Sequence, residues 1–191
     1  MKKYLLFIMT LAFHVGFSQS WTRNFEYVDD WSSGLAKAGK DQKVGFVDTK
    51  GNVVVAFVYE EAFAFSDGFA AVKKSGRWGF IDSTGKEIIP TSYIETGCFS
   101  EGLAKVKKNG AWGFIDKEGN TAIDYKFNNA GRFMNGLAPV CNEKGMWGYI
   151  NKNGSEVIPY KYGYADSFME GTARVMKNGK WLEIDLDGKE L

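Results

Sequence analysis

Aromatic side chains are the residues of this sequence best suited to binding a ligand. The 191 residues include 6 Trp, 9 Tyr and 15 Phe. Exposed Trp and Tyr rings form platforms on which sugar rings stack, and weak sites repeated along a chain gain affinity by acting together. Tyr125, Tyr160 and Tyr164 follow the least regular pattern among the aromatic residues. We therefore take these three tyrosines as the candidate surface contacts for a ligand.

Acidic residues are the candidates for catalysis, because two carboxylates that meet in space can hydrolyse a glycosidic bond. Most of the acidic residues, however, recur at fixed positions. Asp67, Glu101 and Glu170 each precede a glycine, and Ser33 and Asn135 take this place elsewhere. Such a mixture is typical of solvated turns, so we predict no catalytic residue.

The stretch Asp185-Leu186-Asp187-Gly188 resembles the start of a calcium loop but lacks the other ligands and the closing Glu. Cys98 and Cys141 are the only cysteines. The sequence is compatible with a disulfide between them and also with two free thiols. Neither a phosphate loop of the GxxxxGK[ST] type nor a GxSxG nucleophile motif is present. We expect no metal and no cofactor.

Residues 1–18 have the pattern of a secretory signal peptide. Lys2 and Lys3 precede an apolar run from Tyr4 to Phe17, and small and polar residues follow it. Cleavage after Ser18 or after Ser20 fits this pattern. The apolar run is short for a membrane span, so we expect none after signal removal. The chain is then exported to the periplasm, the cell surface or the medium.

Removal of this segment changes what the chain can do. It takes away Lys2 and Lys3, which lowers the net charge from +1 to −1, so no basic excess favours nucleic acid. It also takes away His14, the only histidine. Triads that need histidine and histidine-based metal sites are therefore excluded.

The rest of the sequence is a tandem repeat. Five glycines are separated by 34, 34, 34 and 35 residues, and each follows an aromatic residue by three positions. These glycines are Gly34, Gly68, Gly102, Gly136 and Gly171. The units they define are residues 31–64, 65–98, 99–132, 133–167 and 168–191. Self-similarity at such a period indicates units that stack on their neighbours.

The second half of each unit contains a Trp-Gly-Phe-Ile-like segment, as in Trp112-Gly113-Phe114-Ile115. This pattern resembles the WG repeat family, also called KWG repeats, whose members are described as arrays of short β-strands in bacterial proteins. The resemblance covers about residues 21–191 and implies a fold with little information on function. Two positions depart from it: Val44 replaces Trp in the first unit, and Leu182 replaces Gly in the fifth.

Alternation of apolar and polar residues predicts strands independently of that resemblance. Ala104 and Val106 alternate with Lys105 and Lys107. Glycine after the tryptophan predicts close approach of a neighbouring backbone or ring. Asp or Asn followed three residues later by Gly predicts type I turns with structural carboxylates. We expect the tryptophans to stack on the equivalent residues of neighbouring units; they are Trp78, Trp112, Trp147 and Trp181.

Two all-β architectures fit these hairpin repeats of about 34 residues. Residues 19–30 look like the tail of a unit whose beginning is absent, because Phe25 precedes Trp31 by the spacing that Tyr59 keeps to Phe65. The fifth unit lacks such a tail. An open curved array with capped ends is the favoured prediction, and a small closed propeller-like ring, sealed by residues 19–30, is the alternative.

The sequence favours an exported, non-catalytic β-repeat protein that presents a surface to a protein or glycan partner. A carbohydrate or cell-wall binding module that uses aromatic stacking is the first alternative. A glycan hydrolase that uses two carboxylates is the second. The sequence does not identify the partner.

Overall fold

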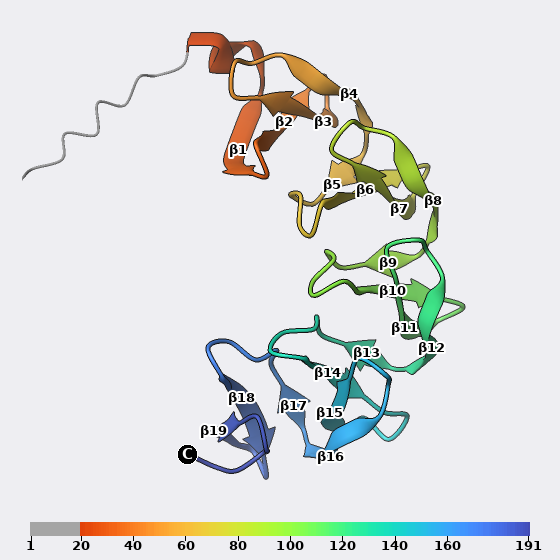
Figure 1. Cartoon of the computed structure of the whole chain (residues 1–191), viewed down its shortest axis with the longest axis vertical. Coiled ribbons are helices and arrows are strands. Elements are labelled where there is room, and N and C mark those ends of the chain that lie inside the picture. Colours follow the sequence, from red (N-terminus) through yellow and green to blue (C-terminus); the bar gives the residue numbers. More distant parts are fainter. Residues whose placement is uncertain (1–19) are drawn as a thin grey trace, which may run out of the picture.

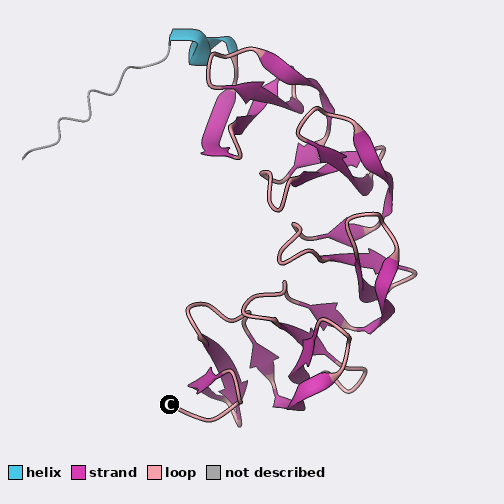
Figure 2. Cartoon of the chain, in the orientation of Figure 1, coloured by secondary structure: helices cyan, strands magenta, loops and turns pink. Residues whose placement is uncertain are grey.

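The computed structural model describes residues 20–191, so the predicted signal peptide lies outside the described residues. This part of the chain forms nineteen β-strands in five antiparallel sheets, with one short 3-10 helix, η1 (Ser20–Asn24), and no α-helix. The predicted all-β fold is confirmed. The sheets, which we number 1 to 5 along the chain, follow one another around an open arc (Figures 1 and 2).

Each complete sheet is a meander of four strands in sequence order. Sheet 1 contains β1 (Tyr27–Ser32), β2 (Leu35–Lys40), β3 (Lys43–Asp48) and β4 (Val53–Tyr59). Sheet 2 contains β5 (Glu61–Ala62), β6 (Phe69–Lys74), β7 (Arg77–Asp82) and β8 (Glu87–Tyr93). Sheet 3 contains β9 (Glu95–Thr96), β10 (Ala104–Lys108), β11 (Ala111–Ile115) and β12 (Thr121–Phe127). Sheet 4 contains β13 (Asn129–Ala130), β14 (Leu137–Cys141), β15 (Trp147–Asn151) and β16 (Glu156–Tyr162), and sheet 5 contains β17 (Tyr164–Ala165), β18 (Thr172–Lys177) and β19 (Lys180–Asp185).

The sheets are offset from the sequence repeats. The last residues of one repeat form a two-residue strand that pairs with the next repeat; Glu61 and Ala62, for example, pair with Lys73 and Val72 of β6. Consecutive repeats therefore share hydrogen bonds as well as packed side chains. This interlocking fixes the order of the sheets along the arc.

The arc is open, as predicted, and the closed ring does not form. β1 pairs antiparallel with β2 of its own sheet. Sheets 1 and 5 lie at opposite ends of the arc in Figure 1, and among the described residues no strand pairing joins them.

Two kinds of turn hold the strands in register, as the turn residues predict. In Asp48-Thr49-Lys50-Gly51, the Asp48 carboxylate accepts hydrogen bonds from the backbone N–H groups of Lys50 and Asn52 at 2.8 and 2.9 Å, and Gly51 has φ +86°. Ser75 and Gly76 both have positive φ, as a two-residue hairpin turn requires. In sheet 1 this second turn contains Asp41 and Gln42, with φ 52° and 59°, and therefore has no glycine.

The glycine after each tryptophan lies beside the backbone of the outermost strand of its own sheet. A Cβ on Gly79 would lie 2.5 Å from the Ile89 carbonyl oxygen, where the β7–β8 register shifts. The predicted close approach is thus to a backbone. Leu182 occupies this position in sheet 5, which has three strands, and no fourth strand lies there to collide with it.

The core lies in the joints, by which we mean the packed spaces between consecutive sheets. A Phe or Tyr two residues after the Trp position packs against the first aromatic residue of the next repeat, with ring centroids 4.8 to 4.9 Å apart in every joint. The pairs are Phe46 with Phe65, Phe80 with Phe99, Phe114 with Phe133, and Tyr149 with Phe168.

The tryptophans pack differently from our expectation. Trp78, Trp112 and Trp147 are buried in the joints. Their rings contact other residue types, however, such as Phe63 beside Trp78. Trp181 is 46% exposed, because no sheet follows sheet 5 among the described residues. The Phe pair, rather than the tryptophan, makes the repeated ring contact across each joint.

Trp21 closes the outer face of sheet 1. Gly85, Gly119, Gly154 and Gly188 lie against an aliphatic side chain of the preceding sheet. Gly51 lies instead against the Trp21 ring, and Trp21 packs edge-on against Phe25 with centroids 6.0 Å apart. Residues 20–25 thus cover a face that the preceding sheet covers in every other case.

Replacing Gly79 by Ala is expected to lower the free energy of unfolding by about 1–3 kcal/mol, because the added methyl group collides with the β8 backbone. The measurement is urea unfolding followed by circular dichroism. Gly163→Ala is the matched control, since the nearest atom to a Cβ there is 3.8 Å away. Equal losses in both variants would contradict the role assigned to Gly79.

Replacing Gln42 by Gly is expected to raise the free energy of unfolding by about 0.5–1 kcal/mol, because glycine relieves the left-handed conformation at φ 59°. The reciprocal change, Gly76→Gln, places a side chain at the equivalent position of sheet 2 and should lower stability. Thermal unfolding of both variants tests this pair. Shifts of the same sign would refute it.

Candidate functional site

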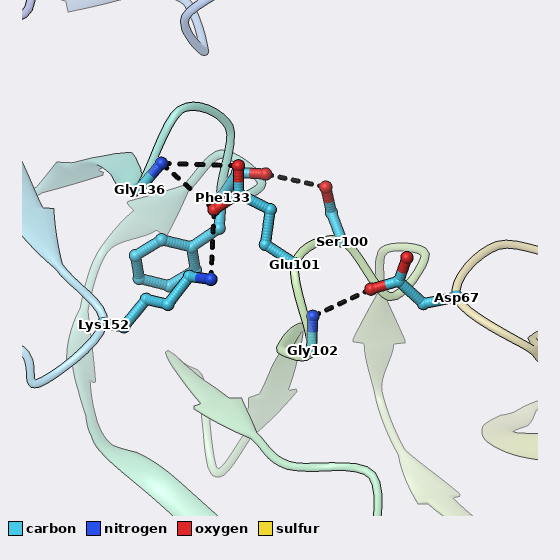
Figure 3. Close-up of polar contacts among 7 residues, drawn as sticks. All are labelled: Asp67, Ser100, Glu101, Gly102, Phe133, Gly136 and Lys152. Carbon is cyan, nitrogen blue, oxygen red and sulfur yellow. Dashed lines mark hydrogen bonds and ion pairs between the residues drawn. The ribbon is translucent and has the colours of Figure 1, made fainter.

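The repeated acidic residues hold neighbouring sheets together. In Figure 3 the Asp67 carboxylate accepts a hydrogen bond from the Gly102 N–H at 2.8 Å, and the Glu101 carboxylate accepts one from the Gly136 N–H at 3.0 Å. Asn135 accepts the equivalent bond from Gly171. These side chains lie at solvated turns, as predicted, and also bridge to the next sheet.

A serine beside each of the first bridges makes a second contact. The hydroxyl groups of Ser32, Ser66 and Ser100 donate to the carbonyl oxygens of Phe65, Phe99 and Phe133 at 2.6 to 2.7 Å. Met134 and Met169 occupy this position in the last two sheets. The joint between sheets 4 and 5 therefore lacks this serine contact.

The turn carboxylates are also engaged by the backbone. The Asn52 side chain and backbone N–H groups donate to Asp48 and hold its pKa below the ordinary value. Asp185 accepts from the N–H groups of Asp187 and Lys189, which is the ordinary turn of the repeat. Within residues 20–191, no group of three or more His, Cys, Asp or Glu side chains is arranged to hold a metal ion.

Both cysteines are free thiols. Cys98 is half-buried and Cys141 is buried in β14, and burial raises the pKa of each thiol. Both groups are therefore protonated at neutral pH.

The three candidate tyrosines have different surroundings. Tyr125 is half-buried and packs against the joint between sheets 2 and 3. Tyr160 packs against the joint between sheets 3 and 4 and borders a cavity of about 240 Å³ with Phe127 and Asn142. Tyr164 is 42% exposed and lies at the joint between sheets 4 and 5, between Trp147 and Trp181.

The joint between sheets 4 and 5 is packed by different residues from the other joints, and Pro139 and Ser167 fill the space beside Gly131. Beside Trp78, the Phe63 ring stacks at 5.0 Å with an interplanar angle of 9°. Beside Trp112, the Lys105 ammonium lies 4.6 Å from the ring centroid. At the corresponding positions beside Trp147, the chain has Gly131 in place of Phe63 and Pro139 in place of Lys105.

Two cavities open at this joint, and we call them together the sheet 4–5 cleft. The first, of about 250 Å³, is lined by aromatic and polar residues that include Asn129, Pro139, Trp147 and Tyr164. The second, of about 370 Å³, is lined by residues that include Arg132, Arg174, Thr172 and Glu183. Asp166 and Ser167 border both cavities.

The backbone around Asp166 and Ser167 is held in place from sheet 4. The Tyr149 hydroxyl donates to the Asp166 carbonyl oxygen at 2.8 Å, and the Ser167 hydroxyl donates to the Arg132 carbonyl oxygen at 2.9 Å. Phenylalanine occupies the position of Tyr149 in the first three repeats. The extra hydroxyl of Tyr149 therefore orders the segment that separates the two cavities.

Charges of both signs surround the second cavity. The Thr172 hydroxyl donates to the Glu183 carboxylate at 2.7 Å, and the Arg174 guanidinium lies 4.7 Å from the centroid of the Trp181 ring. Burial and the nearby Asp166 carboxylate raise the pKa of Tyr164, so its hydroxyl stays protonated near neutral pH and can donate a hydrogen bond. Sequence reasoning identified Tyr164 but missed the polar residues around it, because they belong to three different turns and strands.

Among the described residues, no helix is long and apolar enough to cross a membrane.

A comparison with curated proteins gave no match.

Solved structures share the fold at low sequence identity. The computationally designed protein Ika8 is 15% identical with a TM-score of 0.56, over 86% of this chain and 60% of that one. Hsv2p of Kluyveromyces lactis is 11% identical with a TM-score of 0.56, over 85% of this chain and 62% of that one. This chain thus spans about three fifths of the length of the structures it matches.

The family comparison is more specific. The model of the WG containing repeat matches four consecutive segments, residues 45–78, 78–110, 112–145 and 147–181. These segments contain the Trp-Gly positions, the bulged strands and the joint-forming Phe or Tyr described above. The chain therefore belongs to the family of proteins with the WG containing repeat.

Proposed function

We propose that this protein is an exported, non-catalytic β-repeat protein that binds a partner on its surface, and that the sheet 4–5 cleft is its binding site. The observation that carries the proposal is the pair of adjoining cavities at this joint, which share Asp166 and Ser167 and are lined by aromatic, polar and charged side chains.

The chemistry of the cleft favours a glycan over a protein segment. Tyr164 presents an exposed ring, and Asn129, Ser167 and Asp166 offer donors and acceptors at the same cavity. A sugar ring has an apolar face that stacks on aromatic rings and hydroxyl groups that need such partners. The cavity volume of about 250 Å³ is small for a ligand pocket and suits about one sugar ring.

One observation favours a second function, glycan hydrolysis. Asp166 and Glu183 both border the larger cavity, so the hydrolase alternative has a definite pair of carboxylates. Glu183 is held by the Thr172 hydroxyl, and Asp166 lies on the segment ordered by Tyr149. We favour binding without catalysis, because the Glu183 carboxylate is already engaged by the Thr172 hydroxyl.

The binding proposal predicts that Tyr164→Ala lowers the affinity for a glycan at least about tenfold, because the exposed stacking ring is lost. The experiment is a glycan array and a cell-wall pulldown, followed by titration of the best ligand. Tyr125→Ala is the matched control, since Tyr125 packs at a different joint, and it should leave affinity unchanged.

Silence across a broad array, or equal losses in both tyrosine variants, would sink the glycan proposal. Incubation of the bound glycan with wild type and with Asp166→Asn and Glu183→Gln separates the two functions. Product formed by wild type and absent in both variants would establish a hydrolase.

The export proposal predicts that mass spectrometry of the protein from its producing cells finds Gln19 as the first residue, or Trp21 if cleavage follows Ser20. Cell fractionation should place the protein outside the cytoplasm. A mature chain that retains Met1 would overturn export.

A further inference from the structure

The outer strand of sheet 1 differs from the outer strands of the other sheets. β4, β8, β12 and β16 each form the last strand of a four-stranded sheet and so have one edge that no strand within residues 20–191 pairs with. Figure 1 shows them on the convex side of the arc. An open edge offers backbone N–H and C=O groups to any other strand, and proteins protect such edges with proline or charged residues.

Three positions protect the outer strands of sheets 2, 3 and 4. Each of these positions carries a charged residue, a proline or a hydroxyl residue. They are Glu87, Thr121 and Glu156 at the first position, Pro90, Asp124 and Pro159 at the second, and Ser92, Lys126 and Lys161 at the third. In β4 the same positions carry Val53, Ala56 and Val58. β4 has therefore lost every one of these protections.

The β4 side chains at these positions are exposed. Val53 is 53% exposed and Val58 47%, and the neighbouring Val54 is 38% exposed, although all three are apolar. The strand from Val53 to Tyr59 contains no charged residue and no proline. An exposed apolar edge strand of this kind is costly to leave in water and pairs readily with another strand.

We propose that β4 pairs antiparallel with β4 of a second copy of this chain, about a two-fold axis at Ala56. In this register Val54 of each copy faces Val58 of the other, and the two Ala56 residues face each other. Residues at alternate positions of a strand share one face, so these exposed valines meet on the same side of the joined sheet. Sheet 1 and its partner then form one continuous eight-stranded sheet.

A second copy suits this edge because its own β4 is uncharged and its exposed valines, Val54 and Val58, cover those of the first copy. β4 contains no charged residue, so no like charges meet within the strand pair. The first charged residue after β4, Glu60, lies opposite the uncharged Asn52. The two-fold axis makes each contact twice. Because one strand pair is a small interface, the dimer is expected to dissociate in the micromolar range.

The first test is sedimentation velocity of the purified protein over a concentration series. Wild type should shift from monomer to dimer as its concentration rises to about 500 μM. Ala56→Pro and Val58→Lys, which copy the residues of the other outer strands, should each weaken dimerisation at least about tenfold. Val157→Lys on β16 is the matched control, since Val157 is 45% exposed on a different outer strand.

The second test fixes the register. The two Ala56 Cα atoms face each other across an antiparallel pair, at about 4.5–5.5 Å, which suits a disulfide. Ala56→Cys should therefore give a covalent dimer on mild oxidation, whereas Asp124→Cys at the same position of β12 should not.

Circular dichroism and thermal unfolding check that each variant is folded. If one of the two β4 variants misfolds, the other still tests the proposal. The proposal is overturned if wild type stays monomeric throughout the series, or if it dimerises equally well with a folded Val58→Lys or Ala56→Pro chain. These outcomes are independent of the glycan titration at the sheet 4–5 cleft.

Discussion

The fold depends on one contact, the aromatic pair that crosses each joint. Each sheet has apolar side chains on both faces and cannot bury them alone, so a sheet is stable only between neighbours. The ring pairs such as Phe80 with Phe99 lie at 4.8 Å and are fully buried. Fully burying a phenylalanine side chain contributes about 1.5–3 kcal/mol, so each pair makes a substantial contribution to the stability of its joint.

The same constraint accounts for the unusual residues at the two ends of the arc. Trp21 covers the first sheet at the place where an aliphatic side chain of a preceding sheet packs elsewhere. In sheet 5, Glu183 stands at the position of the joint-forming Phe, and Thr172 replaces the Leu of sheets 3 and 4. Both polar side chains border the second cavity of the sheet 4–5 cleft, where they remain partly hydrated.

The candidate site arises where the repeat departs from its own rule. Gly131 and Pro139 change the packing beside Trp147, where a cavity opens, and the Tyr149 hydroxyl holds the segment next to it. β4 departs from the rule in another way, because its protective residues are replaced by valine and alanine. In an array of near-identical units, residues that differ from the repeat pattern distinguish one surface from another. Such residues lie at the two places where we infer binding.

The sequence by itself determined the strands, the turns and the repeat period. Asp48 and Gly51 act within five residues, so their roles follow from local backbone chemistry. The glycine at Gly79 was predicted to allow close approach, but only the bulged β7–β8 register identified the Ile89 carbonyl as its neighbour. The tertiary structure also decided that β5 joins the next sheet, that Phe80 rather than Trp78 makes the repeated ring contact, and that Asp166 and Glu183 border one cavity. These features depend on how consecutive sheets rotate and pack against each other, and that geometry brings together residues whose spacing in the chain carries no common signal.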